Sequence, residues 1–224
     1  MSGAIMQSDP AARQLQASCR SRCARVAREQ GFSVIDILMV VALIGIIAAI
    51  AVPVTGSAVS GQKFNNDSQA LTNLVGLAKM RASAAYTRAR VRANLVARTF
   101  ALERWDKTTN TWVTEGAVTP LSLGVTFGFG TVATAPPNTQ TNIGFSGACR
   151  VGLTAATATI GNTACVVFNS RGLPVDGAGV PFGGHALYLT DGRAVSGTTV
   201  TSTPRIRRWW TPAHLAKAAW RERQ

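Results

Sequence analysis

The sequence contains one long apolar stretch, which runs from Gly31 to Pro53. Between residues 32 and 54 the only charged side chain is Asp36. A helix of that length covers roughly 34 Å, enough to cross a hydrocarbon layer of about 30 Å. Arginines gather in the preceding residues, between positions 20 and 28, and such a bias keeps that end of a chain in the cytoplasm. The stretch therefore predicts a single-span membrane anchor, with the C-terminal part exported.

The start of this stretch has a second peculiarity. An aspartate in an apolar helix costs about 3 kcal/mol at the bilayer centre and less near its edge. Asp36 is thus either a tolerated acid in an ordinary signal anchor, or the partner of an α-amine created by cleavage between Gly31 and Phe32. The second interpretation resembles the type IV prepilin family, whose pattern is glycine, phenylalanine, an acid at the fifth mature position, and an apolar run. Gly31, Phe32, Ser33, Asp36 and Pro53 match that pattern.

The sequence departs from the prepilin pattern in two ways. The acid is aspartate where glutamate is usual, and the leader, residues 1–31, is longer than the common short basic leader. The resemblance implies that a prepilin peptidase cuts after Gly31 and that the amine of Phe32 is methylated. Two opposite charges about 4 Å apart attract by about 4 kcal/mol at an effective dielectric constant of about 20. Asp36 is therefore expected to set the packing register of neighbouring subunits.

The resemblance also implies partners and a location. The chain is expected in the inner membrane, with a cytoplasmic N terminus and a periplasmic C-terminal domain, until it joins a filament. Its partners are then the prepilin peptidase, the lipid bilayer, an inner-membrane assembly platform, and other pilins or pseudopilins. The net charge of +13 and a pI near 11.2 add an anionic partner such as nucleic acid, phospholipid or lipopolysaccharide. The alternative is a basic surface that serves solubility or matches an acidic subunit.

The four cysteines fall into two pairs. Cys19 and Cys23 lie in the leader, whereas Cys149 and Cys165 lie in the exported part, where the compartment favours disulfides. A bridge between the second pair would contribute about 3 kcal/mol in the chain-entropy model. A metal pair is the alternative, but the histidines and the short spacing of a zinc site are missing. The sequence favours the disulfide.

Hydrophobic periodicity predicts an α+β fold. After Pro53, apolar residues recur at spacings of three and four as far as Tyr86, which predicts that the anchor continues into an amphipathic helix. From Arg90 the period changes to two, with strands expected at 90–97, 99–105 and 111–116 and a turn at 106–110. Residues 130–164 predict a long loop. A further strand precedes a turn at Arg171–Gly172, and a hairpin turns at Asp191–Gly192.

Several of these segments, in their order, resemble the GspH/FimT family of minor pilins and pseudopilins. They are LAKMRASAAYTRARVRANL, WDKTTNTW, FNSRGLP and a late Arg-x-Arg strand. The resemblance implies a type IV pilin-like fold, in which a long N-terminal helix packs on an antiparallel β-sheet domain. The expected parts are the leader 1–31, the transmembrane half-helix 32–54, the amphipathic half-helix 55–89, the β-sheet domain 90–211, and a basic tail 212–224. The tail begins with a proline and is expected to form a short amphipathic helix.

The sequence predicts no enzyme and no cofactor. It lacks a G-x-S-x-G elbow, a Walker A loop and an H-E-x-x-H motif, and no metal site is expected. His185 is expected to be a half-buried strand residue rather than a catalytic base. His214 is expected to be solvated. A non-enzymatic subunit of a type IV pilus or a type II secretion pseudopilus fits best.

The C-terminal segment from Thr203 suggests a second function. It interleaves arginines and tryptophans, and such residues bind phosphates and stack on bases. FimT-type members of the family include DNA-binding subunits of natural transformation with a Gly-Arg-x-Arg segment, and here Pro204 replaces that glycine. Arg205, Arg207 and Arg208 are the candidate DNA-binding residues. The alternatives are an edge strand whose charges prevent aggregation and, for the whole chain, a plain membrane-anchored domain.

Overall fold

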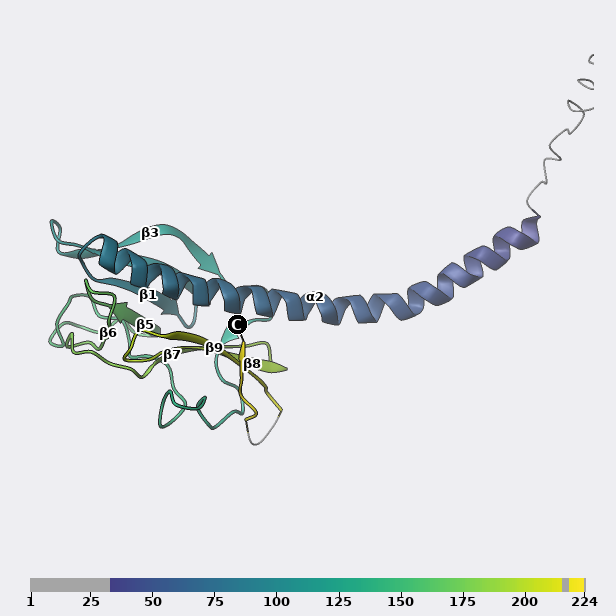
Figure 1. The fold of residues 1–224 in the computed structure, drawn as a ribbon. Coiled ribbons are helices and arrows are strands. Elements are labelled where there is room, and N and C mark those ends of the chain that lie inside the picture. Colours follow the sequence, from purple (N-terminus) through teal and green to yellow (C-terminus); the bar gives the residue numbers. More distant parts are fainter. Residues whose placement is uncertain (1–32, 215–217, 224) are drawn as a thin grey trace, which may run out of the picture. The chain divides into compact units, whose positions relative to one another are not determined.

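The computed structural model describes residues 33–214 and 218–223, without the side chains of residues 50–58. The chain divides into two compact units, 1–53 and 54–224. One helix, α2, extends from Val34 to Ala84 and belongs to both units (Figure 1). The helix predicted to follow Pro53 is thus continuous with residues 34–53.

The strands of the second unit form two antiparallel sheets (Figure 1). Sheet A has the order β3-β2-β1-β5-β6 and sheet B has the order β10-β9-β8-β7-β4. The strands of sheet A are β1 Ala89–Asn94, β2 Thr99–Asp106, β3 Thr111–Pro120, β5 Thr163–Phe168 and β6 Pro174–Val175. The strands of sheet B are β4 Thr126–Phe127, β7 His185–Thr190, β8 Ala194–Val200, β9 Ile206–Pro212 and β10 Arg221–Arg223. The family resemblance implied one antiparallel sheet domain, and the structure divides it into two sheets.

The main core lies between α2 and the two sheets. The helix contributes a buried stripe at helical spacing, made of Phe64, Leu71, Val75, Ala78 and Ala82. Alternate residues of the strands face it, among them Val91, Leu102 and Val166 of sheet A and Leu187, Leu189 and Val200 of sheet B. A second, smaller cluster forms around Tyr188, whose hydroxyl donates to Gln140 Oε1 over 2.9 Å. Burial raises the pKa of Tyr188.

Polar side chains connect α2 to the rest of the second unit. The hydroxyls of Ser68 and Ser196 lie 2.5 Å apart, and Thr72 Oγ1 lies 2.8 Å from the Oγ1 of Thr198. Asp67 accepts hydrogen bonds from the backbone N–H and the hydroxyl of Ser122, at 2.7 and 3.0 Å. Because each of these groups has a specific partner, they fix the position of the helix along its axis, against β8 through the two hydroxyl pairs and against the β3–β4 connection through Asp67.

The end of α2 differs from the sequence prediction. The helix stops at Ala84, and Tyr86, with φ of 47°, adopts the left-handed conformation that commonly closes a helix. Thr87 then donates its hydroxyl to Trp105 O over 3.1 Å, which ties the turn to β2. The predicted apolar stripe is wrong at two positions, because Tyr86 at its end is 77 % exposed and Leu77 within it is 38 % exposed.

The remaining strand predictions are mostly confirmed. The turn at 106–110, the turn at Arg171–Gly172 and the hairpin at Asp191–Gly192 all join strands as expected. Residues 130–162 contain no named strand, in line with the predicted loop. The expected helix in the tail is wrong for residues 218–223, because Arg221–Arg223 pair with β9 as strand β10.

Within the part of the chain that the structure describes, no helix combines the length and apolar character needed to cross a membrane. The predicted anchor, residues 32–54, extends beyond the described side chains, since Phe32 and the side chains of 50–54 are not among them. The membrane-spanning segment therefore stays a prediction.

Candidate functional site

The predicted processing site and its acid lie at the start of α2. Gly31 and Phe32 fall outside the described residues, so the cleavage site stays a prediction. Ser33 and Asp36 close the first turn: Ser33 Oγ accepts the N–H of Ile35, and Asp36 Oδ2 accepts the N–H of Ser33, each over 3.3 Å. This reciprocal arrangement is a capping box, and it places a negative charge at the positive end of the helix dipole.

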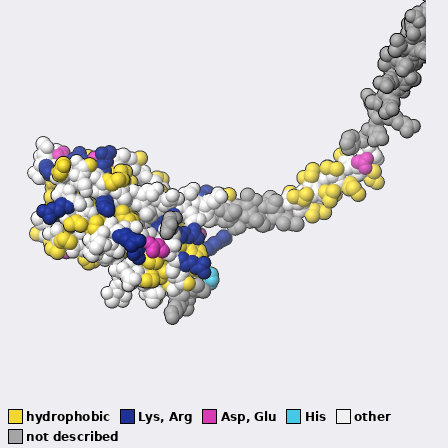
Figure 2. Space-filling view, in the orientation of Figure 1, with side chains coloured by type: hydrophobic (Ala, Val, Ile, Leu, Met, Phe, Trp, Pro, Cys, Tyr) yellow, Lys and Arg dark blue, Asp and Glu magenta, His cyan; other side chains and the backbone are white. Residues whose placement is uncertain are grey.

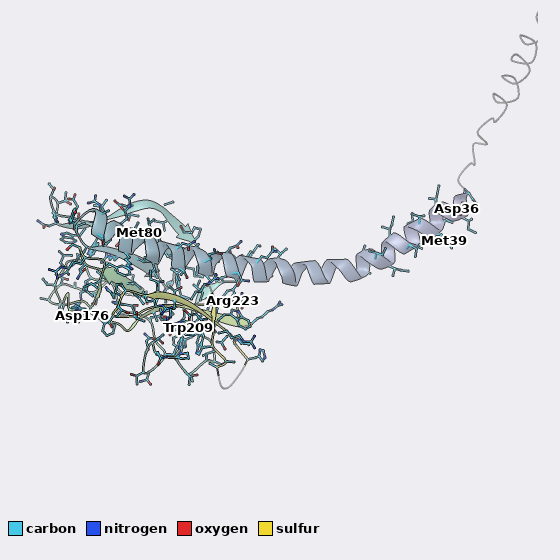
Figure 3. The ribbon with its side chains drawn as sticks, in the orientation of Figure 1. Asp36, Met39, Met80, Asp176, Trp209 and Arg223 are labelled. Atoms are coloured by element: carbon cyan, nitrogen blue, oxygen red, sulfur yellow. A yellow bond between two sulfur atoms is a disulfide. The ribbon has the colours of Figure 1, made fainter. Side chains whose placement is uncertain are left out.

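Beyond Asp36 the helix surface is apolar and exposed. The large apolar side chains from Val34 to Ile47 are 51–74 % exposed. Figure 2 shows them as a continuous hydrophobic surface, and Figure 3 labels Asp36 and Met39 on it. An exposed apolar surface of this size is costly in water and is typical of segments that contact lipid or another protein.

A basic groove lies within the second unit, between α2 and the last two strands. Its volume is about 330 Å³, and it is lined by four arginines, Arg205, Arg207, Arg208 and Arg223. The opposite wall consists of the polar residues Gln69, Thr72 and Asn73 of α2. We call this site the basic groove. It brings together the three arginines predicted from the sequence and adds Arg223, which strand β10 supplies.

The pairing of β9 positions the arginines. Ile206 packs against the main core, as the two-residue period predicted, and Thr201 Oγ1 accepts the N–H of Arg205 over 3.2 Å. The edge-strand alternative is wrong for β9, because β8 pairs with one side of it and β10 with Arg208–Trp210 on the other. On this side the edge strand of sheet B is β10, and on the other side it is β4.

Positive charges outnumber negative charges in the lining of the basic groove. Arg208 and Arg223 stand directly opposite each other on β9 and β10, and like charges in that position repel. Burial, and then Arg223, lower the pKa of Arg208. Glu222 is the one carboxylate in the lining of the groove, 3.7 Å from Arg207 Nε.

Further contacts hold the arginines in place. Arg223 lies 5.0 Å from the ring centre of Trp210 and donates to Asn65 Oδ1 over 3.3 Å. Figure 3 shows Arg223 and Trp209 in the same part of the second unit. Four guanidiniums against one carboxylate give the groove a net positive charge, which suits a phosphate or carboxylate group.

The predicted disulfide is confirmed. Cys149 and Cys165 are bonded, with their Cα atoms 5.0 Å apart. The bridge joins the long loop to strand β5, where the N–H of Cys165 also donates to Gly147 O over 3.0 Å. Across the described residues, no group of three or more His, Cys, Asp and Glu side chains is arranged to hold a metal ion.

His185 is more buried than expected, at 4 % exposure. Its Nε2 lies 3.0 Å from Val175 O and its Nδ1 lies 3.3 Å from Ser146 Oγ, so both ring nitrogens are engaged. Burial lowers the pKa of His185. His214 is exposed, as predicted.

Sequence reasoning missed one buried ion pair. Arg90 donates to Glu103 through Nε over 2.6 Å, and Arg92 Nη1 reaches the other oxygen of Glu103 at 3.2 Å. The side chains of Arg90 and Glu103 are only 2 % and 6 % exposed. No signal in the sequence showed that the loop carrying Arg150 covers this face of β1, where Arg90 Nη1 donates to Arg150 O.

Comparison with known proteins yields one structural similarity. No family model matches the sequence, and no curated protein matches it. The fold is similar to that of the minor pseudopilin EpsH from the Type 2 Secretion System of Vibrio cholerae, with 12 % sequence identity and a TM-score of 0.33. The alignment covers 72 % of this chain and 96 % of EpsH.

Proposed function

We propose that this chain is a non-enzymatic minor pilin or pseudopilin, processed by a prepilin peptidase and assembled into a type IV pilus or a type II secretion pseudopilus. The proposal places the chain in the inner membrane before assembly, with its C-terminal unit in the periplasm. It rests chiefly on one observation: the exposed apolar surface from Val34 to Ile47, which continues as one helix into a packed half.

The two halves of α2 have different surroundings, and this supports the proposal. The residues from Phe64 to Ala82 bury a stripe against two sheets, so that half needs no further partner. The apolar side chains from Val34 to Ile47 have none within the described part of the chain. Before assembly, a lipid bilayer would cover these apolar side chains. After assembly, the same helices of neighbouring subunits would cover them.

Asp36 has two roles in this proposal. In the isolated chain its carboxylate caps α2 through the N–H of Ser33. After cleavage before Phe32, an α-ammonium of a neighbouring subunit would compete for the same carboxylate. Because that contact pairs two full charges among apolar helices, it would be stronger than the cap.

Mass spectrometry of the N terminus tests processing. Co-expression with a prepilin peptidase should give a chain that begins at N-methylated Phe32. A chain that retains residues 1–31 under these conditions would contradict the proposal.

Substitution of Asp36 tests assembly. Asp36→Ala should abolish incorporation into filaments, whereas Asp36→Glu should preserve it, because the charge is kept. Ser33→Ala is the matched control, since it removes one half of the cap and leaves the carboxylate. Filaments that incorporate Asp36→Ala as well as the unchanged chain would rule out the proposed role of Asp36.

The basic groove favours a second candidate function, the binding of DNA in natural transformation. We expect duplex DNA binding by the full chain to weaken steeply with salt, and the Arg205→Ala, Arg207→Ala double variant to reduce the slope of log K against log salt by about two. The control is Arg98→Ala with Arg171→Ala, which removes the same charge from exposed sites that do not line the groove. Equal effects of the two double variants would reject the groove as the DNA site.

A further inference from the structure

A cavity of about 290 Å³ lies on the face of sheet A opposite α2. Strand residues form its floor, namely Arg90 of β1, Trp112 of β3, and Cys165 and Val167 of β5. Because neighbouring residues such as Val91 and Val166 face the main core, these side chains point to the other side of the sheet. The loop that follows Gly147 and the segment from Val175 to His185 supply the walls.

Three arginines and the disulfide build the wall nearest this loop. Arg88 Nη1 donates to Leu153 O over 2.6 Å, and Arg90 Nη1 donates to Arg150 O over 2.5 Å. Arg150 Nη1 itself donates to two carbonyls further along the loop, at 2.5 and 2.8 Å. The bond between Cys149 and Cys165 fastens the start of the loop to the floor. The cavity is therefore built by specific contacts.

Several hydrogen-bond donors around the cavity have no acceptor. Trp112 Nε1 is buried and has no partner among the described residues. A guanidinium offers five N–H groups, and the Nε and Nη2 of Arg88 and of Arg150 also have no acceptor within the described part of the chain. Trp112 Nε1 is the buried donor in this group, and a buried donor without a partner is costly. The arginine N–H groups are open to a ligand, so the donors together suit an anionic acceptor at this place.

The rest of the lining is largely apolar. Ala148, Leu153, Val167, Val175 and Phe182 line the cavity. An engineered apolar cavity of about 150 Å³ holds a benzene molecule, so the volume here accommodates a ring together with a small polar group. His185 contributes its ring, which meets Phe182 edge to face at 5.1 Å, but both of its nitrogens are already engaged. The cavity is thus suited to binding rather than to proton transfer.

One acid limits the charge of the ligand. Asp176 also lines the cavity, and its Oδ1 accepts the N–H groups of Ala178 and Val180, each over 2.9 Å. Arg90 is paired with Glu103, so Arg88 and Arg150 against Asp176 leave one net positive charge, which a singly charged ligand balances. A carboxylate is small, singly charged and planar, and it matches the fork of a guanidinium.

We propose that this cavity binds a monocarboxylate with an aromatic or branched apolar body. The apolar part lies over Val167, Val175 and Phe182, and the carboxylate accepts hydrogen bonds from Arg88, Arg150 and Trp112. Two sources supply this chemistry, a free small acid or the C-terminal residue of a peptide. The site is separate from the apolar helix and from the basic groove, so it does not depend on the proposed assembly or DNA binding.

The indole signal of Trp112 tests this site directly. The full chain, purified in detergent and labelled with ¹⁵N at its tryptophans, is titrated with N-acetyl-phenylalanine and with N-acetyl-phenylalanine amide. Trp112→Phe identifies the signal. The acid should shift it to saturation, and the amide should bind at least about tenfold more weakly, because it lacks the charge that the arginines bind. No saturable shift with the acid, or equal binding of acid and amide, would overturn the proposal.

A blocking variant locates the binding. Ala148 is exposed at the rim, so Ala148→Phe should fill the entrance and abolish the shift. Ala97→Phe adds the same group at an exposed turn away from the cavity and should leave the shift intact. The other indole signals report whether the variant is folded. A shift that persists in folded Ala148→Phe would place the binding elsewhere and refute the assignment.

A peptide distinguishes the two sources. A hexapeptide ending in phenylalanine with a free carboxylate shifts the Trp112 signal if the cavity accepts a C-terminal residue. The same peptide with an amidated end is its control. If N-acetyl-phenylalanine shifts the Trp112 signal and the hexapeptide does not, the ligand of the cavity is a free small acid.

Discussion

Removal of Glu103 is expected to destabilise the second unit more than any loss of a surface ion pair. Its side chain is 6 % exposed and that of Arg90 is 2 % exposed. Burial lowers the pKa of Arg90, and Glu103 opposes that shift by Coulomb attraction and a hydrogen bond. Without Glu103, a buried guanidinium loses its main partner, and breaking a buried pair in this way typically costs about 3–5 kcal/mol.

The expected shift is large enough to measure by thermal unfolding. For a unit of this size, 1 kcal/mol corresponds to about 2–4 °C in Tm, so Glu103→Leu should lower the Tm by roughly 6–20 °C. Near-UV circular dichroism is a suitable probe, because the rings of Trp105 and Trp112 lie 5.3 Å apart, edge to face, beside this pair. The full chain in detergent serves as the sample.

Two further variants show whether the buried charge is the cause. Glu115 pairs with Arg104 at 2.9 Å, but their side chains are 26 % and 34 % exposed, so Glu115→Leu should cost only about 0.2–1 kcal/mol. The double variant Arg90→Met, Glu103→Leu should regain most of the loss, because no buried charge remains unpaired. If Glu103→Leu and Glu115→Leu lowered the Tm equally, the reasoning would be refuted.

Three other perturbations give equally direct tests. Replacement of Cys149 and Cys165 by alanine should lower the free energy of unfolding by about 3 kcal/mol, since the bridge spans 16 residues; urea unfolding measures this, and an unchanged midpoint would contradict it. Burial lowers the pKa of His185 in the folded chain below its ordinary value of 6.5. As the pH falls, the unfolded chain therefore binds a proton at His185 before the folded chain does, and the free energy of unfolding should decrease below about pH 6.5. His185→Gln should remove this part of the decline below about pH 6.5, and an unaltered decline would exclude His185 as its source. Gly197→Ala should cost about 1–3 kcal/mol of unfolding free energy, because the new methyl group would meet the ring of Tyr188 at 2.7 Å; unchanged urea unfolding would show that the ring can move.

Local patterns in the sequence predicted the elements of the fold well. The spacing of Phe64, Leu71 and Val75 indicated a helix with one buried face, and the packing confirms it. Turn residues such as Asp191 and Gly192 located the hairpins. These features depend on residues close together in the chain, which is why a single sequence reveals them.

Long-range pairing could not be predicted in the same way. Strand β1 pairs with β5, with Ala93 opposite Ala164, although the meander and the long loop lie between them in the sequence. This pairing places β5 in sheet A, whereas the next long strand, β7, belongs to sheet B. Strand β10 joins sheet B through three residues of a segment whose proline and alanines suggested a helix. Tertiary pairing overrode local propensity there.

In the candidate sites, too, local patterns were predictable and long-range contacts were not. Arg205, Arg207 and Arg208 were predicted as a group because they are adjacent in the sequence, and they do line one groove. Arg223 joined them only through the pairing of β9 and β10. The capping box of Ser33 and Asp36 had a clear Ser-x-x-acid signal, but the pattern was interpreted only in terms of cleavage and assembly.

The polar contacts between α2 and its surroundings also have a mechanical consequence. The Ser68–Ser196 and Thr72–Thr198 hydroxyl pairs, together with the carboxylate of Asp67, hold the helix over the short stretch 67–72. Tension applied along the axis of α2 would stretch these hydrogen bonds together, in shear, whereas a strand peeled from a sheet edge loses its bonds one after another. A pull on the helix would therefore be transmitted to sheet B through strand β8 before the apolar stripe slips by a single turn.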